Sequence, residues 1–460
     1  MSKNISVCLH WLAVLFLLPV FVACSSDYRS AVPQDSIAIA SFDFGQISSS
    51  GSIGKTVTDA ALRMFHLDDV GNCGIDFREK VYAFETKDGY FGAVFCLSDK
   101  DDFKAWLSAQ KKNGECTELN ERRGYEFTVF NGNLMIGFSD EAMVMLGPVI
   151  PSDLSRLKRK MIGYFEAGEA TDGIFARMTS KLDSINAPIA LVARIAALPE
   201  KFVAPFMLGV SDEVSPNDIM ISASVAVRNK CVFVTGETFS CNDKVSKVIN
   251  AASRSYRPIG DGFIKKLSPD ALISVLCCAE GEDFVRHIRR NESLRTMLFG
   301  LNTAIDIDKM LKSISGDCFF FVFPSMHNGG LDFQMLAELK NSDWLTDVDY
   351  WKKSCPEGTR IMDCADAGKF LLSSNDLSLY FGVNEKNHLY IATSGNLVEN
   401  MEMQAEKELS PDIREVVSGK RLCAVINVGS LMEHRTEIGV MKDLSFPVVD
   451  SLQTVILCVK

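Results

Sequence analysis

The stretch YEFTVF-NG-NLMIGF, which runs from Tyr125 to Phe138, contains the clearest fold signal in the chain. Two short apolar runs stand on either side of Asn131-Gly132. Asparagine followed by glycine accepts the positive φ angles of a tight two-residue turn, so this stretch predicts a β-hairpin. Asp88-Gly89 lies between two further apolar runs and predicts a second hairpin of the same kind.

Outward from these hairpins, short apolar runs recur along the sequence. We expect further strands at 36–43, 188–196, 218–227, 230–239, 271–279, 317–324, 378–394, 421–428 and 452–459. Helical periodicity predicts amphipathic helices at 102–111, 152–164, 172–184, 243–253, 282–291, 307–314 and 346–354. Many connections are too short for parallel crossovers, so the sheets should be mainly antiparallel. The predicted fold class is α+β, with helices packed on one face of each sheet.

The order of these features runs twice along the chain. The motif Pro-Gln-Asp at 33–35 precedes a strand, as does Pro-Asp-Ala at 269–271, and Gly-Ile-Asp at 74–76 is echoed by Ala-Ile-Asp at 304–306. The hairpin at Asn131-Gly132 is matched with a turn at 385–387. Repetition of this kind indicates internal duplication.

We therefore predict two related domains, at 33–255 and 256–460, the second of which is shorter at its C-terminal end. The boundary is placed in 253–262, where serine, proline and glycine interrupt the periodic pattern.

The N-terminal segment has the features of an export signal. Lys3 is its one charged residue, and 7–22 is almost wholly apolar but too short to span a bilayer comfortably. Small residues precede Cys24, as the lipoprotein-processing peptidase requires. The sequence thus predicts a signal peptide at 1–23, lipid attachment at Cys24 and a tether at 24–32.

Several acyl chains on Cys24 would give a durable anchor without a transmembrane helix. The predicted location is therefore the cell envelope, with the membrane as one partner, and both periplasmic and surface-facing leaflets remain open. About twelve residues separate Cys24 from the first predicted strand, a reach of at most ~40 Å. The net charge of −11 argues against a nucleic-acid partner, which requires a basic surface.

Several motifs together resemble a known family. Cys24, Tyr28, Val32-Pro33 and Asp35 before an apolar strand, followed by Gly-Ile-Asp at 74–76, resemble a domain-of-unknown-function family of bacterial cell-envelope lipoproteins. The resemblance extends over the mature chain, although Ser36 stands where alanine is expected. It implies an anchored, two-part α+β protein and assigns no catalytic residue.

The cysteines suggest core residues more than a disulfide framework. Several of the fourteen lie in apolar, strand-like runs and are interpreted as buried thiols, namely Cys96, Cys277, Cys278, Cys318, Cys423 and Cys458. Cys355 and Cys364 flank Pro-Glu-Gly and are the pair expected to form a bridge if one exists. No cysteine spacing typical of zinc is present.

Two patterns that could indicate an enzyme are incomplete. Residues 49–56, SSGSIGKT, resemble a phosphate-binding loop that lacks its first glycine, and a flexible loop after a strand is the preferred interpretation. The histidines outside the predicted signal peptide form no HExxH motif and no i, i+4 pair, so we expect structural roles for them. These are His66, His287, His327, His388 and His434.

Two charged clusters have alternative interpretations. Asp343, Asp347 and Asp349 surround Trp344 and could bind calcium, but acidic residues at a helix N-terminus explain them better. A basic cluster could contact anionic lipid or glycan, or form the outer face of a packed helix. It consists of Arg156, Lys158, Arg159 and Lys160.

No concentrated set of titratable residues of the kind that catalysis needs is present in this sequence. The preferred hypothesis is a lipid-anchored, non-catalytic binding or scaffold protein for a protein or glycan partner, without a cofactor or metal. The alternative is an exported hydrolase with dispersed catalytic residues.

Overall fold

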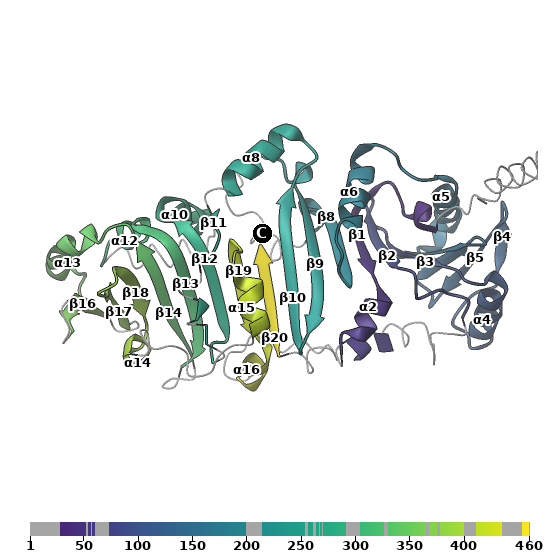
Figure 1. Cartoon of the computed structure of the whole chain (residues 1–460). Helices are drawn as coiled ribbons and strands as arrows, with labels where there is room; N and C mark the ends of the chain where they lie inside the picture. Colours follow the sequence, from purple (N-terminus) through teal and green to yellow (C-terminus); the bar gives the residue numbers. More distant parts are fainter. Residues whose placement is uncertain are drawn as a thin grey trace, which may run out of the picture. The chain divides into compact units, whose positions relative to one another are not determined.

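The computed structural model divides into two compact units, Met1–Ile37 with His66–Ala176 and Ala38–Phe65 with Arg177–Lys460 (Figure 1). It describes residues 28–51, 54–56, 58–59, 73–198, 214–253, 256–260, 264–265, 267–268, 270–290, 304–325, 330–364, 368–374, 378–399, 411–434 and 453–459. The predicted signal peptide and Cys24 lie outside these residues.

The first unit contains an antiparallel sheet with the strand order β2-β3-β7-β6-β5-β4. Its strands are β2 (Val81–Thr86), β3 (Phe91–Cys96), β4 (Asn120–Arg122), β5 (Tyr125–Phe130), β6 (Leu134–Phe138) and β7 (Ala142–Gly147). The hairpin predicted at Asn131-Gly132 is confirmed, because it joins β5 to β6 with φ angles of 47° and 70° at the turn.

Two helices cover opposite faces of this sheet. They are α4 (Lys100–Lys112) and α5 (Leu154–Glu166). Phe103 of α4 contacts Phe138 at 5.1 Å between ring centroids, whereas Met161 of α5 lies over Gly137. Because adjacent residues of a strand point to opposite faces, the prediction of helices on one face is wrong for this unit.

The N-terminal end of the described chain belongs to the first unit. A short 3₁₀ helix, η2 (Tyr28–Ala31), is followed by Val32, and Tyr28, Ala31 and Val32 are all buried. A second 3₁₀ helix, η3 (Pro151–Asp153), leads into α5. Residues 28–32 of the tether expected at 24–32 therefore pack into the folded body of the first unit.

The second unit contains one long sheet in the order β1-β8-β9-β10-β20-β19-β12-β13-β14-β18-β17-β16-β15, with β11 on the end of β12. The division between the units falls within β1, after Ile37. The pairing of β10 with β20 is parallel and the other pairings in this order are antiparallel, which confirms the mainly antiparallel α+β prediction. The strands are β1 (Ser36–Phe42), β8 (Ile189–Arg194), β9 (Met220–Arg228), β10 (Cys231–Phe239), β11 (Tyr256–Arg257), β12 (Ile273–Glu280), β13 (Ile314–Pro324), β14 (Leu331–Leu339), β15 (Arg360–Asp363), β16 (Lys369–Ser373), β17 (Ser378–Val383), β18 (His388–Ala392), β19 (Leu422–Asn427) and β20 (Thr454–Val459).

Helices pack on both faces of this sheet as well. One apolar core places Met310, Trp344 and Trp351 against the sheet, and a second core on the opposite face contains Ile413 and Val417. The helices are α2 (Phe44–Ser49), η4 (Ile195–Ala197), η6 (Pro216–Asp218), α8 (Asp243–Ser253), α10 (Gly281–Arg290), α12 (Ile307–Lys312), η7 (Asp343–Asp347), α13 (Val348–Ser354), α14 (Gly395–Glu399), α15 (Pro411–Val417) and α16 (Val428–Glu433), and α6 (Gly173–Asp183) crosses the division between the units.

The strand orders correspond between the predicted repeats. The order β2-β3-β7-β6-β5-β4 in the first unit matches β13-β14-β18-β17-β16-β15 in the second, and β1-β8-β9 matches β12-β19-β20. The turn at 385–387 joins β17 to β18, which correspond to β6 and β7. Asn131-Gly132 joins β5 to β6, so the turn at 385–387 corresponds to the next hairpin of the first repeat and not to Asn131-Gly132. The duplication itself stays a prediction, because strand order alone does not establish superposition.

The compact units do not follow the predicted division at residue 255. The last strand, β20, pairs with β10 in the register Cys231↔Thr454 and with β19 on its other side. This pairing holds β8, β9 and β10 in the same unit as the C-terminal half. Residue 255 therefore stays a proposed boundary between repeats and is not the edge of a compact unit.

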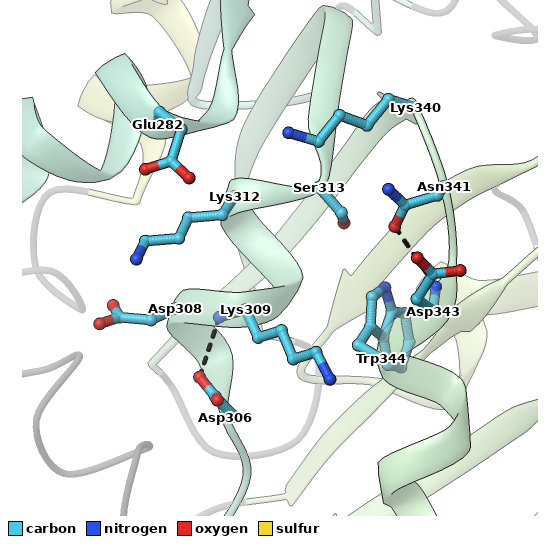
Figure 2. Close-up of a pocket in the computed structure, with 10 residues that line it drawn as sticks. All are labelled: Glu282, Asp306, Asp308, Lys309, Lys312, Ser313, Lys340, Asn341, Asp343 and Trp344. Carbon is cyan, nitrogen blue, oxygen red and sulfur yellow. Dashed lines mark hydrogen bonds between the residues drawn. The ribbon is translucent and has the colours of Figure 1, made fainter.

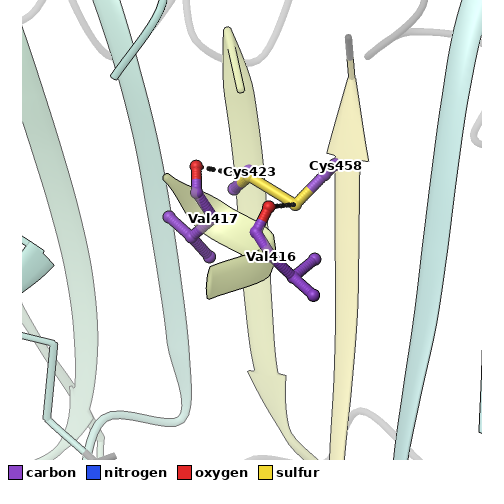
Figure 3. The surroundings of a disulfide bond; sticks show 4 residues. All are labelled: Val416, Val417, Cys423 and Cys458. Carbon is purple, nitrogen blue, oxygen red and sulfur yellow. Dashed lines mark hydrogen bonds between the residues drawn. A yellow bond between two sulfur atoms is a disulfide. The ribbon is translucent and has the colours of Figure 1, made fainter. Parts of the chain in front are cut away.

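The disulfide differs from the pair that the sequence favoured. Cys423 and Cys458 stand directly opposite each other on β19 and β20, with 4.2 Å between their Cα atoms, and they form a disulfide (Figure 3). The expected bridge between Cys355 and Cys364 is not formed. Cys423 was interpreted as a buried thiol because its pairing with β20 is invisible in the sequence.

Candidate functional site

A cleft of about 500 Å³ lies beside α12 in the second unit (Figure 2). The N-terminal part of α10, the length of α12 and the segment that connects β14 to η7 contribute its lining. Asp306 begins α12, because its side chain accepts a hydrogen bond from the backbone N–H of Lys309 at 2.9 Å. This cap fixes the helix end that brings charged side chains to the cleft.

Trp344 forms an apolar wall of the cleft and is fully buried. Its indole stacks on Trp351, with 6.1 Å between centroids and 7° between the planes. The Nε1 atom is buried and, among the described residues, has no hydrogen-bond acceptor. A buried donor without an acceptor costs about 1–3 kcal/mol, so an acceptor that reached this N–H group would remove that cost.

The lysines of the cleft differ in whether a carboxylate neutralises them. Lys309 donates to Asp347, and this hydrogen bond holds the pKa of Lys309 above its usual value. Within the described part of the chain, neither Lys312 nor Lys340 has an ion-pair partner. Two ammonium groups are therefore available to an anion.

Acidic side chains also line the cleft. Asp306 is engaged in capping α12, and Asp308 forms an ion pair with Arg289. Glu282 and Asp343 also face the cleft (Figure 2). The cleft thus offers both positively charged donors and negatively charged acceptors to a ligand.

The acidic trio predicted around Trp344 does not converge. Asp343 lines the cleft, Asp347 binds Lys309, and Asp349 contacts Lys352 at 3.3 Å. Asp347 precedes α13 and Asp349 lies in its first turn, as the helix N-terminus interpretation expects. In the described ranges, no group of three or more His, Cys, Asp or Glu side chains could hold a metal ion.

The resemblance of 49–56 to a phosphate-binding loop has a different structural context from the one expected. These residues follow helix α2 instead of a strand. A Cβ atom on Gly54 would lie 1.8 Å from the carbonyl oxygen of Ile47, so close packing explains this glycine. Residues 52–53 lie outside the described residues.

The histidines are scattered. The backbone N–H of His388 donates to Asn384 at 2.9 Å, and the Nδ1 atom of His434 lies 2.9 Å from the carbonyl oxygen of Ser430. His66, His327 and the side chain of His287 lie outside the described residues. None of the described histidines lines the cleft.

One member of the predicted basic cluster on α5, Lys160, forms ion pairs within the first unit. Lys160 binds Asp88 at 2.6 Å and Asp35 at 3.3 Å, and its ammonium group lies 5.1 Å from the centroid of Tyr90. Burial acts to raise the pKa of Asp88, but hydrogen bonds from Lys160 and a neighbouring threonine lower it overall. The network unites the Asp35 motif with the Asp88-Gly89 turn.

The rest of the basic cluster points elsewhere. Arg156 donates to the Tyr90 hydroxyl at 2.9 Å and to Asp153 at 2.7 Å. Lys158 lies 5.9 Å from the ring centroid of Phe127. Arg159 is exposed. The four residues therefore do not form one lipid-binding patch.

No pattern in the sequence indicates that Lys312 and Lys340 belong to one site. They lie on α12 and after β14, and only the packing of these elements brings them to one cleft. The sequence singles out Asp343 beside Trp344 only as part of an acidic helix N-terminus, with a calcium site as the less favoured alternative.

A family profile described as a domain of unknown function, DUF4836, matches residues 29–419. The chain belongs to this family. The resemblance inferred from the sequence motifs to a domain-of-unknown-function family is thereby confirmed. A search of curated proteins finds no match for this DUF4836 chain.

Solved structures of TP0453 are among those similar to this DUF4836 chain. Crystal form I is 10% identical with a TM-score of 0.32, and the match covers 51% of this chain and 88% of that one. Crystal form IV is 13% identical with a TM-score of 0.27, and the match covers 42% and 71%. No helix in the described residues is long and apolar enough to cross a membrane.

Proposed function

We propose that this protein is a lipid-anchored binding protein of the cell envelope, and that the cleft beside Trp344 holds the acidic group of an envelope glycan. The buried indole N–H of Trp344 carries the proposal, because it lacks an acceptor at the wall of a cleft that contains Lys312 and Lys340. A carboxylate or phosphate oxygen would satisfy the indole, and the lysines that line the same cleft would attract its negative charge.

The mixed charge of the cleft favours an acidic sugar over a simple anion. Glu282 and Asp343 face the same cleft as the lysines. Their oxygens can accept hydrogen bonds from sugar hydroxyl groups, which are donors that an inorganic anion lacks. The volume of about 500 Å³ lies within the usual range of small-molecule sites.

The anchor rests on the sequence. The apolar segment at 7–22 and the small residues before Cys24 support export and acylation. An exported hydrolase is the alternative, and it draws its support from the two carboxylates Glu282 and Asp343 in the cleft.

Calorimetric titration of the mature chain with Cys24→Ala tests the proposal, with glucuronic acid as the acidic ligand and glucose as the neutral one. We expect binding of the acid only. Lys312→Gln and Lys340→Gln should each weaken it about tenfold, because each removes a charge-assisted hydrogen bond. Lys353→Gln, an exposed lysine of α13 outside the cleft, should not.

Equal weakening by Lys353→Gln, or equal binding of glucose, would contradict the proposed site. Release of sugar products from an acidic oligosaccharide, abolished by Glu282→Gln or Asp343→Asn, would instead establish the hydrolase.

A further inference from the structure

The chain is fixed to the first unit from its first described residue onward. The Tyr28 hydroxyl donates to the carbonyl oxygen of Lys80 at 2.7 Å, and its ring lies 6.0 Å from that of Tyr82. Ala31 and Val32 are 2% and 4% exposed. These contacts join η2 to the start of β2.

Residues 34–36 are also fixed to the first unit by hydrogen bonds and an ion pair. The amide of Gln34 donates to the carbonyl oxygen of Gly168 at 3.3 Å. Lys160 connects Asp35 to Asp88, and Ser36 donates to the carbonyl oxygen of Pro33 at 2.6 Å. The segment from Tyr28 to Ser36 is therefore part of the folded body and adds nothing to the reach of a tether.

This packing shortens the distance between a lipid at Cys24 and the folded chain. Only the steps from Cys24 to Tyr28 remain, which is at most ~14 Å when fully extended. The sequence alone allowed ~40 Å for a tether that continued to the first strand. A reach of ~14 Å is shorter than the diameter of a small domain.

We infer that the surface formed by η2 and the start of β2 lies against the phosphate layer of the anchoring membrane; this inference rests on the proposed lipid anchor. Arg29 and Lys80 supply cationic groups on this surface, and the guanidinium of Arg29 lies 5.3 Å from the ring centroid of Tyr82. Arg78, two residues before Lys80 in the sequence, is 87% exposed and pairs with Asp76 at 2.7 Å.

The experiment compares two probe positions in the full-length, acylated protein. A fluorophore is attached through a non-natural amino acid at Lys80, or at Glu121 on β4 as the matched control. The strand order places β4 five strands from β2, about 24 Å away. The protein is reconstituted in phosphatidylethanolamine and phosphatidylglycerol vesicles that carry a headgroup quencher.

We expect several-fold stronger quenching at residue 80 than at residue 121. Insertion of twelve Gly/Ser residues between Ser26 and Asp27 should remove most of this difference, because it restores a long flexible tether. The Cys24→Ala form should not float with vesicles, which tests the anchor separately.

Three results would overturn the inference. Flotation of the acylated protein with equal quenching at both positions, or with no effect of the insertion, would refute the membrane-facing surface and leave the anchor intact. Failure of the wild-type protein to float would refute both the anchor and this surface.

Discussion

The ion pairs of Lys160 are expected to stabilise the folded state of the first unit. Its ammonium group contacts both Asp35 and Asp88, and the pKa of Asp88 lies below its usual value. A carboxyl whose pKa is lower in the folded state stabilises the protein above its unfolded pKa of about 4, and this stability is lost as the pH falls through the folded value.

We expect Lys160→Met to lower the free energy of unfolding at pH 6, because two carboxylates lose their shared partner. The difference from wild type should shrink as the pH falls from about 4, the unfolded pKa, through the lower pKa that Asp88 has in the folded protein. Urea denaturation at a series of pH values measures this. Lys158→Met on the same helix should show a difference that does not depend on pH, and a pH-independent effect of Lys160→Met would argue against the network.

Tyr164 provides a second test at this scale. It is 7% exposed, its hydroxyl has no hydrogen-bond partner in the described ranges, and burial raises its pKa. Tyr164→Phe should therefore leave the free energy of unfolding unchanged or raise it by up to about 1 kcal/mol.

Tyr90→Phe is the matched control, because the Tyr90 hydroxyl accepts a hydrogen bond from Arg156. It should cost about 1 kcal/mol. A loss in Tyr164→Phe as large as that in Tyr90→Phe would show that the Tyr164 hydroxyl has a partner.

At the scale of elements, the disulfide between β19 and β20 joins residues 35 apart in sequence. A cross-link of this span typically contributes about 2–4 kcal/mol. Reduction should lower the thermal midpoint of unfolding, and the Cys423→Ala/Cys458→Ala double variant should have the lower midpoint with or without reductant. A Cys355→Ser/Cys364→Ser variant that abolished the effect of reductant would contradict the assignment.

Several elements follow from local sequence alone. The β5–β6 hairpin and α8 have the bounds that turn chemistry and helical periodicity indicate, apart from one residue at the start of β6. Strand β7, AMVMLG, was missed because it is buried throughout and shows no alternation. Strand β4, NER, was missed because it is short and exposed.

Contacts between distant segments could not be predicted. The opposition of Cys423 and Cys458 depends on strand pairing, and the cleft depends on how α12 packs beside η7. The environment of Trp344 could not be predicted either. A tryptophan in an acidic stretch of sequence does not indicate whether its indole N–H group has a hydrogen-bond acceptor in the folded protein.

At the scale of the whole molecule, β20 lies inside the long sheet of the second unit, between β10 and β19. Its removal would leave two unpaired strand edges in the middle of that sheet, and such edges favour aggregation. We expect deletion of 453–460 to give an aggregated protein, whereas deletion of Lys460 alone should not. Size-exclusion chromatography with circular dichroism measures this, and a monomeric, folded product of the larger deletion would contradict the pairing.

The position of β20 also sets an order of events during synthesis. A ribosome releases the C-terminal residues last, so β10 is made more than two hundred residues before the strand that will pair with it. Local pairing of β8, β9 and β10 can form early, but the edge of β10 stays open until β20 has been synthesised. The nascent chain therefore carries an unpaired strand edge while more than two hundred residues are synthesised, and it is expected to need a chaperone during that interval.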